Sequence, residues 1–330
     1  MNIQHNIPLA DKNWFKTGGP AKFYCQPTTI EELHDAVVWA RANNQPIFVL
    51  GEGANILISD DGFDGLVIHP NLTQIMHTTS LTSATVTAGA GTNFGKLIDY
   101  CLEHCLLGLE EFSGIPGTVG GSVFINIHYF EFLLGNFLTS AKVIDTVTAE
   151  ILDVDQAWFN FGYNTTTLHD KRYILAQATF RVKPCTPLEA AFAKGRSTEI
   201  IRHRNQRYPT SHTCGSFFRN FYEHEVSLVS NGKKMIFVAY YLDKIGVKGQ
   251  LTQGGAVVSY KHANMLVNQG TATSRDIIEL AKKMQQLVFD NFGILPQAEC
   301  QFIGFKEHPL LCNPNAPITQ STSDSMQENR

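Results

Sequence analysis

The chain of 330 residues has no apolar run that approaches the ~20 residues needed to cross a membrane. Its N-terminal segment lacks both the basic region and the apolar region of a signal peptide. The chain also lacks a basic excess, because 26 Lys and Arg stand against 30 Asp and Glu. The resulting net charge of −4 offers no face to a nucleic-acid backbone. These absences predict a cytoplasmic protein that binds neither membrane nor nucleic acid. We expect a monomer that acts on a small molecule.

The seven cysteines form no recognisable disulfide or metal-binding pattern. Their number is odd, they are scattered, and the closest pair, Cys101 and Cys105, would lie one turn apart on an apolar helix. Free, buried thiols are therefore favoured over a disulfide or a metal site. We predict that the protein holds no metal.

What the chain does contain is a succession of short strands and amphipathic helices. Residues 21–26 read as a strand, 30–43 as a helix and 46–50 as a buried strand that runs into a glycine loop. The remaining strands are expected at 66–69, 75–78, 84–88, 142–145, 151–154, 173–182, 256–259 and 265–268, and the remaining helices at 93–104, 187–204 and 274–292.

Two glycine-rich loops are the strongest candidates for a binding function. Gly51, Gly53 and Asn55 follow a buried strand, where glycines let backbone N–H groups approach an anionic oxygen, although a plain tight turn would use the same residues. The run 114–121 is denser in glycine, which suggests that something flat or charged lies against the main chain. Neither loop has the Rossmann or P-loop pattern.

Eight ordered blocks of sequence fall between residues 13 and 304. The blocks are Asn13-Trp-Phe-Lys-Thr-Gly-Gly, Gly51-Glu-Gly-Ala-Asn-Ile-Leu-Ile-Ser-Asp-Asp-Gly-Phe-Asp-Gly-Leu-Val-Ile, Gly114-Ile-Pro-Gly-Thr-Val-Gly-Gly-Ser, Phe161-Gly-Tyr, Cys214-Gly-Ser-Phe-Phe-Arg-Asn, Gly246-Val-Lys-Gly, Lys261-His-Ala-Asn and Ala298-Glu-Cys-Gln-Phe-Ile-Gly. Taken together, they resemble the MurB family, the UDP-N-acetylenolpyruvoylglucosamine reductases of cell-wall peptidoglycan synthesis. Blocks in this order are far more specific than either loop alone.

The resemblance implies an α+β protein with an FAD-binding fold of the vanillyl-alcohol-oxidase type. Residues 1–70 and 71–208 would form its two α+β subdomains, 209–308 a MurB-like substrate domain, and 309–330 a polar, disordered tail. The short spacing before Ser216 is similar to the compact branch of the family. The residues implied to bind FAD without a covalent bond are Gly51, Gly53, Ala54, Asn55, Gly114, Ile115, Pro116, Gly117, Gly120 and Gly121.

The family chemistry implies hydride transfer from NADPH to FAD and then to the enolpyruvyl group of a nucleotide sugar. Ser216 matches the family's proton donor and Glu299 its acid, whereas the residues alone suggest a buried structural serine and a surface glutamate. The residues implied to contact the substrate are Arg204, Arg219, Asn220, Lys248 and His262.

The departures from the family lie on the substrate side. Asn164 stands where the family has an arginine for the substrate carboxylate, so a bidentate guanidinium contact is missing. Bulky residues at 126–132 replace a glycine-containing segment, and the segments after Arg219 also differ. His128 within that altered segment suits a packed histidine better than a general base or a covalent flavin anchor.

Three functions remain open on these grounds. The first is the peptidoglycan reductase reaction, and the second is an FAD oxidoreductase with a different small-molecule substrate, favoured by Asn164 and residues 128–132. The third is a non-catalytic FAD-binding homologue, against which the retention of Ser216 and Glu299 argues. For the carboxylate of an enolpyruvyl substrate, the candidate cations by type are Arg172, Arg204, Arg207 and Arg219.

Overall fold

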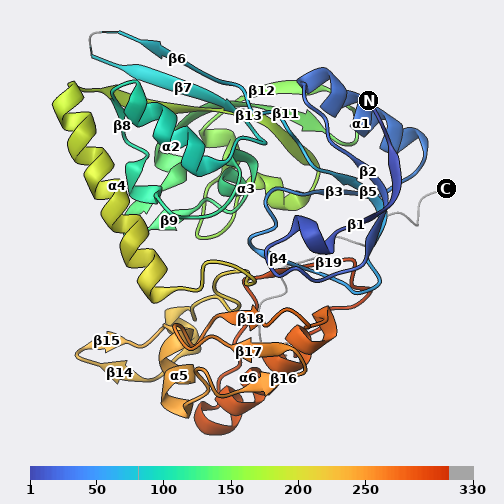
Figure 1. Ribbon diagram of the computed structural model, residues 1–330, viewed down its shortest axis with the longest axis vertical. Coiled ribbons are helices and arrows are strands. Elements are labelled where there is room, and N and C mark those ends of the chain that lie inside the picture. The colour runs from blue at the N-terminus through green and yellow to red at the C-terminus, as the bar shows by residue number, and fades with distance from the viewer. Residues whose placement is uncertain (81, 312–330) are drawn as a thin grey trace.

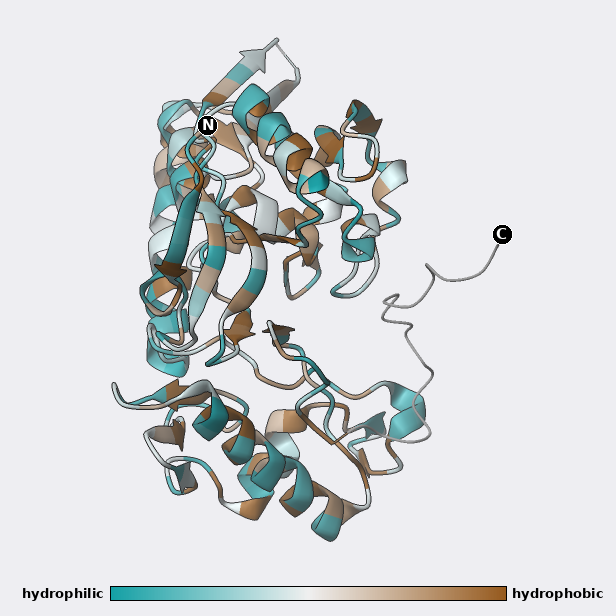
Figure 2. Ribbon diagram, turned by 90° about the vertical axis from the view of Figure 1, so that its right-hand side faces the viewer, coloured by the Kyte–Doolittle hydropathy of each residue, from teal (hydrophilic) through white to brown (hydrophobic). Residues whose placement is uncertain are grey.

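The computed structural model describes residues 1–80 and 82–311, which form a larger upper lobe and a smaller lower lobe (Figures 1 and 2). The upper lobe contains the N-terminal two thirds of the chain, and the lower lobe contains the segment coloured orange to red in Figure 1. Of the predicted tail at 309–330, residues 312–330 lie outside the described residues. Leu310 is buried, and the Gln285 side chain binds both the amide and the carbonyl of Leu311, so the first residues of that range pack on the lower lobe instead.

The first subdomain is a four-stranded sheet, in the order β1-β2-β5-β3, that packs on one helix. Strands β2, β5 and β3 are parallel and β1 is an antiparallel edge strand. The helix buries the apolar face that its spacing predicts, centred on Leu33 and Val37. The bounds are β1 (Gln4–Pro8), β2 (Pro20–Cys25), α1 (Ile30–Ala42), β3 (Ile47–Val49) and β5 (Phe63–Ile68).

The second subdomain is a six-stranded antiparallel sheet in the order β12-β11-β13-β7-β6, with β8 added beside β13. Its apolar face packs on α2 and α3 to form a large core, and α4 runs down the outer edge toward the lower lobe (Figure 1). The bounds are β6 (Ile75–Thr79), β7 (Ala84–Gly89), α2 (Phe94–Glu103), β8 (Leu106–Leu107), α3 (Val119–Phe124), β9 (His128–Tyr129), β10 (Phe132–Leu133), β11 (Leu138–Asp145), β12 (Ile151–Asp155), β13 (Tyr173–Pro184) and α4 (Pro187–Arg207).

The lower lobe packs a three-stranded antiparallel sheet against α5 and α6. The long helix α6 begins at a Thr273 capping box, ends at Gly293 in the left-handed conformation and buries one apolar stripe, as its sequence predicts. The bounds are β14 (Val229–Ser230), β15 (Lys233–Lys234), α5 (Val238–Ile245), β16 (Thr252–Gln253), β17 (Ala256–Val258), β18 (Leu266–Asn268) and α6 (Ser274–Phe292).

A two-stranded parallel ladder joins the lobes. Strand β19 (Gln301–Ile303) pairs with β4 (Ile56–Ile58), so the end of the chain returns to the first subdomain (Figure 1). Just beyond β4, the carboxylate of Asp60 accepts hydrogen bonds from the amides of Ser274 and Arg275, at 2.8 Å and 3.0 Å. An anion at these amides also complements the dipole of α6.

Each predicted strand and helix is present, with ends shifted by a few residues. The prediction of a loop across 114–121 is partly wrong, because α3 begins at Val119 within that run. Consecutive glycines disfavour a helix, but the Thr118 hydroxyl caps this short one by accepting the amide of Gly121. No helix among residues 1–80 and 82–311 is long and apolar enough to span a bilayer.

The contact of Asp60 with the start of α6 predicts a measurable stability. Asp60→Ala should lower the free energy of unfolding by about 1–2 kcal/mol, because two helix amides lose a charged acceptor. Urea denaturation of the full chain measures this difference. Asp61→Ala is the control, because it removes the same charge one residue away, where the side chain makes no hydrogen bond among the described residues. Equal losses of unfolding free energy in the two variants would contradict a stabilising contact between Asp60 and the start of α6.

Candidate active site

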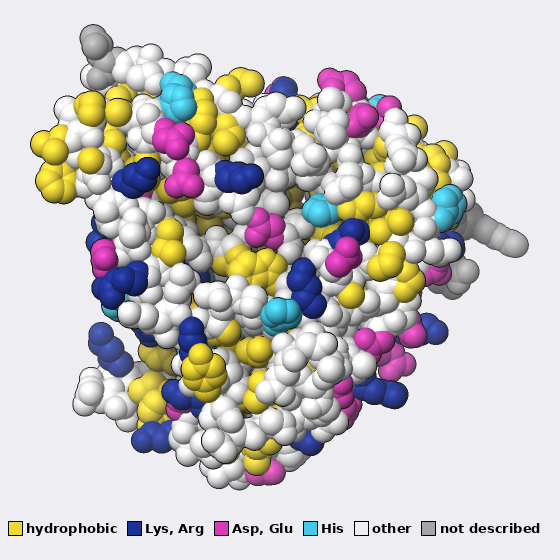
Figure 3. Space-filling model, in the orientation of Figure 1, with side chains coloured by type: hydrophobic (Ala, Val, Ile, Leu, Met, Phe, Trp, Pro, Cys, Tyr) yellow, Lys and Arg dark blue, Asp and Glu magenta, His cyan; other side chains and the backbone are white. Residues whose placement is uncertain are grey.

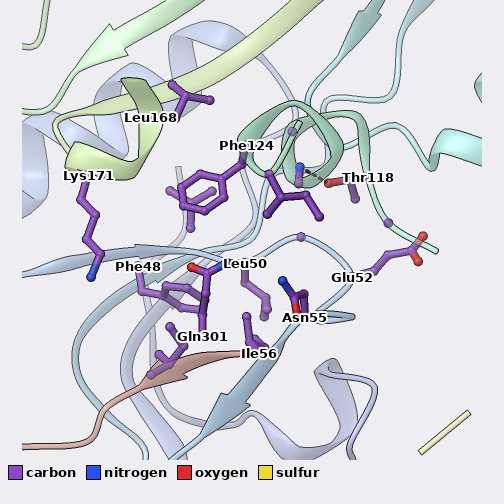
Figure 4. A pocket seen from close by; sticks show the side chains of 18 of the residues that line it. Phe48, Leu50, Glu52, Asn55, Ile56, Thr118, Phe124, Leu168, Lys171 and Gln301 are labelled. Carbon is purple, nitrogen blue, oxygen red and sulfur yellow. Dashed lines mark hydrogen bonds between the residues drawn. The ribbon is translucent and has the colours of Figure 1, made fainter. Parts of the chain in front are cut away.

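A cavity of about 510 Å³ lies between the two glycine-rich loops and the β4–β19 ladder. In Figure 4, Phe48 and Phe124 flank its middle, Lys171 lies at one end, and Glu52, Asn55 and Thr118 lie at the other. Gln301 contributes from the first residue of β19. The cavity therefore has a polar end beside the loops and an apolar middle that suits flat rings.

The first loop presents backbone donors to this cavity. Residues 51–55 all line the cavity, and their amides donate to no acceptor within the described part of the chain. Two of their carbonyls are already used, by the amides of Trp14 and Gln301. The bonded carbonyls fix the loop backbone and leave its N–H groups available to an anion. Such a row of donors suits a pyrophosphate, so these residues fit that part of FAD.

The second loop contributes the start of α3. Pro116, Gly117, Gly120 and Gly121 line the cavity, as predicted from the resemblance, together with Thr118 and Ser122. Gly114 and Ile115 do not line it: the Gly114 carbonyl accepts the Nε of Arg204 at 3.1 Å, and Ile115 packs against the core of the second subdomain. These two residues shape the loop from behind.

At two of the loop glycines, neighbouring protein already leaves no room for a side chain. A Cβ at Gly53 would lie 2.6 Å from the Cα of Asn13, and one at Gly120 would lie 3.1 Å from the carbonyl oxygen of Ala90. At Gly121 a Cβ would meet only the Thr118 hydroxyl, at 3.7 Å, so its side-chain position opens toward the cavity.

The structure brings Ser216 and Glu299 onto neighbouring segments of the lower lobe. Phe218 and Ala298 form an antiparallel bridge, and the carbonyl of Phe217 accepts the amide of Glu299 at 2.9 Å. Ser216 is partly exposed, and its hydroxyl has no protein partner among the described residues. The two candidate catalytic side chains therefore come from paired backbones, and the serine hydroxyl is available to a ligand.

Asn264 is a supporting residue whose role the motif search did not identify. It is buried, and its side chain accepts the amide of Phe218 at 3.1 Å and donates to the carbonyl of the same residue at 2.7 Å. Its own carbonyl accepts the amide of Phe217 at 2.8 Å. The sequence offered one signal for this role, the polar residue that ends the Lys261-His-Ala-Asn block. A buried side-chain amide requires hydrogen-bond partners, so it tends to hold neighbouring backbone in place.

Asn164 lies near the candidate acid. Tyr163, the residue before Asn164, lies near Asn220 and Arg219. Burial raises the pKa of Glu299 to about 7, and the nearby Asn164 side chain opposes this rise. At neutral pH, therefore, a substantial fraction of this carboxyl carries a proton.

The predicted substrate-contacting cations are distributed around this point. Arg219 is ion-paired with Glu225 at 2.8 Å and lies over Tyr222, and its charge is also felt by Tyr163. Arg172 is bonded to Asp145 and so is not available as a free cation. Of the candidates for a carboxylate partner, Arg219 is the one placed beside the Tyr163–Asn164 turn.

His262 lies between the other two predicted residues, Arg204 through the Tyr208 ring and Lys248 through its charge. The Arg204 guanidinium lies 5.3 Å from the Tyr208 ring, which packs edge-on against His262. Lys248 pairs with Asp243 at 3.4 Å, and burial lowers the pKa of His262. Figure 3 shows Lys, Arg and His side chains along the junction of the two lobes, where such side chains would meet an anionic ligand.

The altered segment that contains His128 folds as the β9–β10 hairpin. The His128 ring lies 5.2 Å from that of Tyr163, and burial lowers the pKa of this histidine. Tyr129, the next residue, lies beside Arg204. The hairpin therefore lies between Tyr163 and Arg204, and its His128 is a packed imidazole whose burial disfavours the charged form.

The open side of Gly121 predicts a selective effect on cofactor binding. Gly121→Leu should lower FAD affinity at least about tenfold, because the side chain would fill the polar end of the cavity. Fluorescence titration with FAD measures this, and Gly195→Leu is the control, because Gly195 lies in helix α4 with nothing within 4 Å of its side-chain position. Parental FAD affinity in the Gly121 variant would exclude this wall as a cofactor contact.

The chain is similar to known proteins over nearly its whole length. Residues 206–303 match the C-terminal domain of UDP-N-acetylenolpyruvoylglucosamine reductases, and residues 21–155 match an FAD binding domain. The reductase of Synechococcus sp. (strain JA-3-3Ab) is 32% identical over 314 residues, 94% of each chain. That of Gloeobacter violaceus is 33% identical over 304 residues, 92% of this chain and 96% of the relative.

A solved structure agrees with these sequence relatives. The crystal structure of the reductase (MurB) from Thermus caldophilus has a TM-score of 0.71 at 26% identity, covering 92% of this chain and 99% of that one. The FAD-binding match includes both glycine-rich loops of the cavity, and the C-terminal match includes Ser216 and Glu299. The expected α+β FAD-binding fold is thereby confirmed, and the chain belongs to the UDP-N-acetylenolpyruvoylglucosamine reductase family of FAD-dependent oxidoreductases.

Proposed function

We propose that this protein is a UDP-N-acetylenolpyruvoylglucosamine reductase, which uses NADPH and FAD to reduce the enolpyruvyl group of a nucleotide sugar. One observation carries the proposal. The free Ser216 hydroxyl and the partly protonated carboxyl of Glu299 come from paired segments, and β19, which follows that carboxyl, pairs with the strand that leaves the cofactor loop. The two candidate proton donors would thus be connected to the flavin cavity through this ladder.

These positions suggest a separate role for the cofactor and for each group of residues. Bound FAD would supply the hydride chemistry, from NADPH to the carbon–carbon double bond of the substrate. The amides of residues 51–55 would hold the pyrophosphate, and Phe48 and Phe124 would contact flat rings. Ser216 would deliver a proton to the carbon next to the one that receives the hydride.

Glu299 and its neighbours would bind the reacting end of the substrate. A protonated carboxyl can donate a hydrogen bond to the substrate carboxylate, which an ionised one would repel. Asn220 and Arg219 lie near the same turn and would add a hydrogen bond and a positive charge, although Glu225 already offsets that charge. Arg204, Lys248 and His262 would meet the diphosphate of a nucleotide sugar.

A second candidate is an FAD oxidoreductase with a different small substrate. Two observations favour it: the residue near Glu299 is the uncharged Asn164, and the β9–β10 hairpin places His128 against Tyr163. Both features alter the surroundings of the reacting group and leave the cofactor loops unchanged. Substrate specificity depends on side chains of this kind.

Anaerobic half-reactions separate these functions. Under the leading proposal, NADPH bleaches the flavin absorbance of the FAD-loaded protein, and the enolpyruvyl nucleotide sugar then restores it. Bleaching without reoxidation would point to the different substrate. A flavin that NADPH never reduces, in a protein that binds FAD, would point to the third function, a non-catalytic homologue.

Loss of the Ser216 hydroxyl should affect one half-reaction alone. Ser216→Ala is expected to slow reoxidation by the enolpyruvyl substrate by ~100-fold or more, which is the usual scale of general acid catalysis, while reduction by NADPH stays near the parental rate. Stopped-flow absorbance of the two half-reactions measures both rates. Equal slowing of the two would assign Ser216 to folding or flavin placement.

A further inference from the structure

Asn93 contacts both glycine-rich loops of the cavity, although it belongs to neither. Its side-chain Nδ2 donates a hydrogen bond to the carboxylate of Glu52, in the first loop. Its backbone forms an antiparallel bridge with Thr118, in the second loop. Asn93 itself does not line the cavity, so any effect that it has on a cofactor passes through these two neighbours.

The bridge to the second loop is reinforced on both sides. The amide of Phe94 donates to the carbonyl of Gly117 at 2.9 Å, and the amide of Val119 donates to the carbonyl of Thr92 at 2.8 Å. These bonds pair the segment that leads into α2 with the segment that leads into α3. The start of α3, which lines the polar end of the cavity, is therefore fixed relative to Asn93.

The contacts of the Asn93 side chain fix its orientation. Its Oδ1 accepts the amide of Lys96 at 3.0 Å, which makes Asn93 the N-terminal cap of α2. Its Nδ2 is the atom that can donate to a carboxylate, and Glu52 provides that acceptor. Both ends of the carboxamide are thus engaged, one by helix α2 and the other by the first loop.

The two loops approach each other closely beside this pair. A Cβ at Gly51 would lie 2.9 Å from the Thr118 hydroxyl oxygen, so the loops lie against each other there. Figure 4 shows the Glu52 side chain extending away from the apolar middle of the cavity, at the end where Thr118 lies. A carboxylate free to move at this end would repel an anionic ligand, and the bond from Asn93 restrains that movement.

We propose that Asn93 is a positioning residue for FAD, which holds the loop at 51–55 and the start of α3 in one arrangement around the pyrophosphate. The amides of that loop line the cavity without an acceptor among the described residues. Donors that are already in place bind a ligand more tightly, because the entropy of ordering them is lost on folding and not on binding. The proposal rests on the FAD of the proposed function, but it requires no particular substrate or electron donor.

The test exchanges the donor and the acceptor of this hydrogen bond. Asn93→Asp keeps the cap of α2, because aspartate also caps helices, but it places a second carboxylate against Glu52. FAD affinity should fall by about tenfold or more, the scale of one hydrogen bond to a charged group. Fluorescence titration of the flavin-free full chain with FAD measures this affinity.

Adding Glu52→Gln to Asn93→Asp should rescue binding. The new glutamine can donate to the new aspartate, so the bond is restored with its direction reversed, and the formal charge equals that of the parent. FAD affinity should then return to within about threefold of the parental value. Glu52→Gln alone is the matched control: it keeps an acceptor for Asn93 and should bind FAD nearly as the parent does, so that the rescue is not an effect of the lost charge.

The proposal is overturned by parental affinity in Asn93→Asp, by no recovery in the double variant, or by a gain from Glu52→Gln that is equally large with and without Asn93→Asp. If Asn93→Asp does not fold, Asn93→Ser takes its place, since serine caps the helix, adds no charge and offers no amide to Glu52. Its affinity should also fall, and parental affinity there would equally overturn the proposal. These titrations need neither NADPH nor substrate, so their failure is distinguishable from a failure of the proposed reaction, which the reoxidation assay reports.

Discussion

The parallel pairing of β4 with β19 is the constraint on which the site depends. Strand β4 leaves the loop at 51–55, and β19 begins two residues after Glu299, so one ladder sets the distance between the cofactor cradle and the candidate acid. The amide of Gln301 donates to the carbonyl of Asn55 at 3.0 Å, which ties the end of the loop to the same ladder. A slip of one residue would turn the strand's side chains to the opposite face and move Glu299 along its partner.

The lobes are joined by a shared core as well as by this ladder. Phe15 and Leu57 come from the first subdomain, yet both are fully buried within the core of the lower lobe. Asn268, also buried, donates to the carbonyl of Phe15 at 2.8 Å. Apolar side chains of the first subdomain and of the lower lobe are therefore buried against each other. This burial stabilises the lower lobe through its contact with the upper lobe.

Local patterns predicted most of the fold, and the family resemblance predicted the cavity, but neither predicted the contacts that complete the site. The spacing of apolar residues and the capping residues identified helices such as Ser274–Phe292, because both patterns depend on residues only a few positions apart. The sequence did not reveal why Gly53 and Gly120 must lack a side chain, since the atoms that exclude one belong to Asn13 and Ala90, which are distant in sequence. The pairing of Phe218 with Ala298, which brings the segments of Ser216 and Glu299 together, likewise joins residues far apart in the sequence, and no local period predicts it.

The chemistry at the junction follows from which groups are charged there. An anionic end of a substrate would meet the uncharged Asn164, a Glu299 that is partly protonated, and an Arg219 whose charge is offset by Glu225. Recognition in such surroundings depends more on hydrogen bonds than on ion pairs. Sites of that kind discriminate strongly against a ligand that lacks the matching group, because buried donors are then left without partners. The resemblance places Asn164 where the family has an arginine, and a carboxamide there would recognise a substrate carboxylate by hydrogen bonds in place of an ion pair.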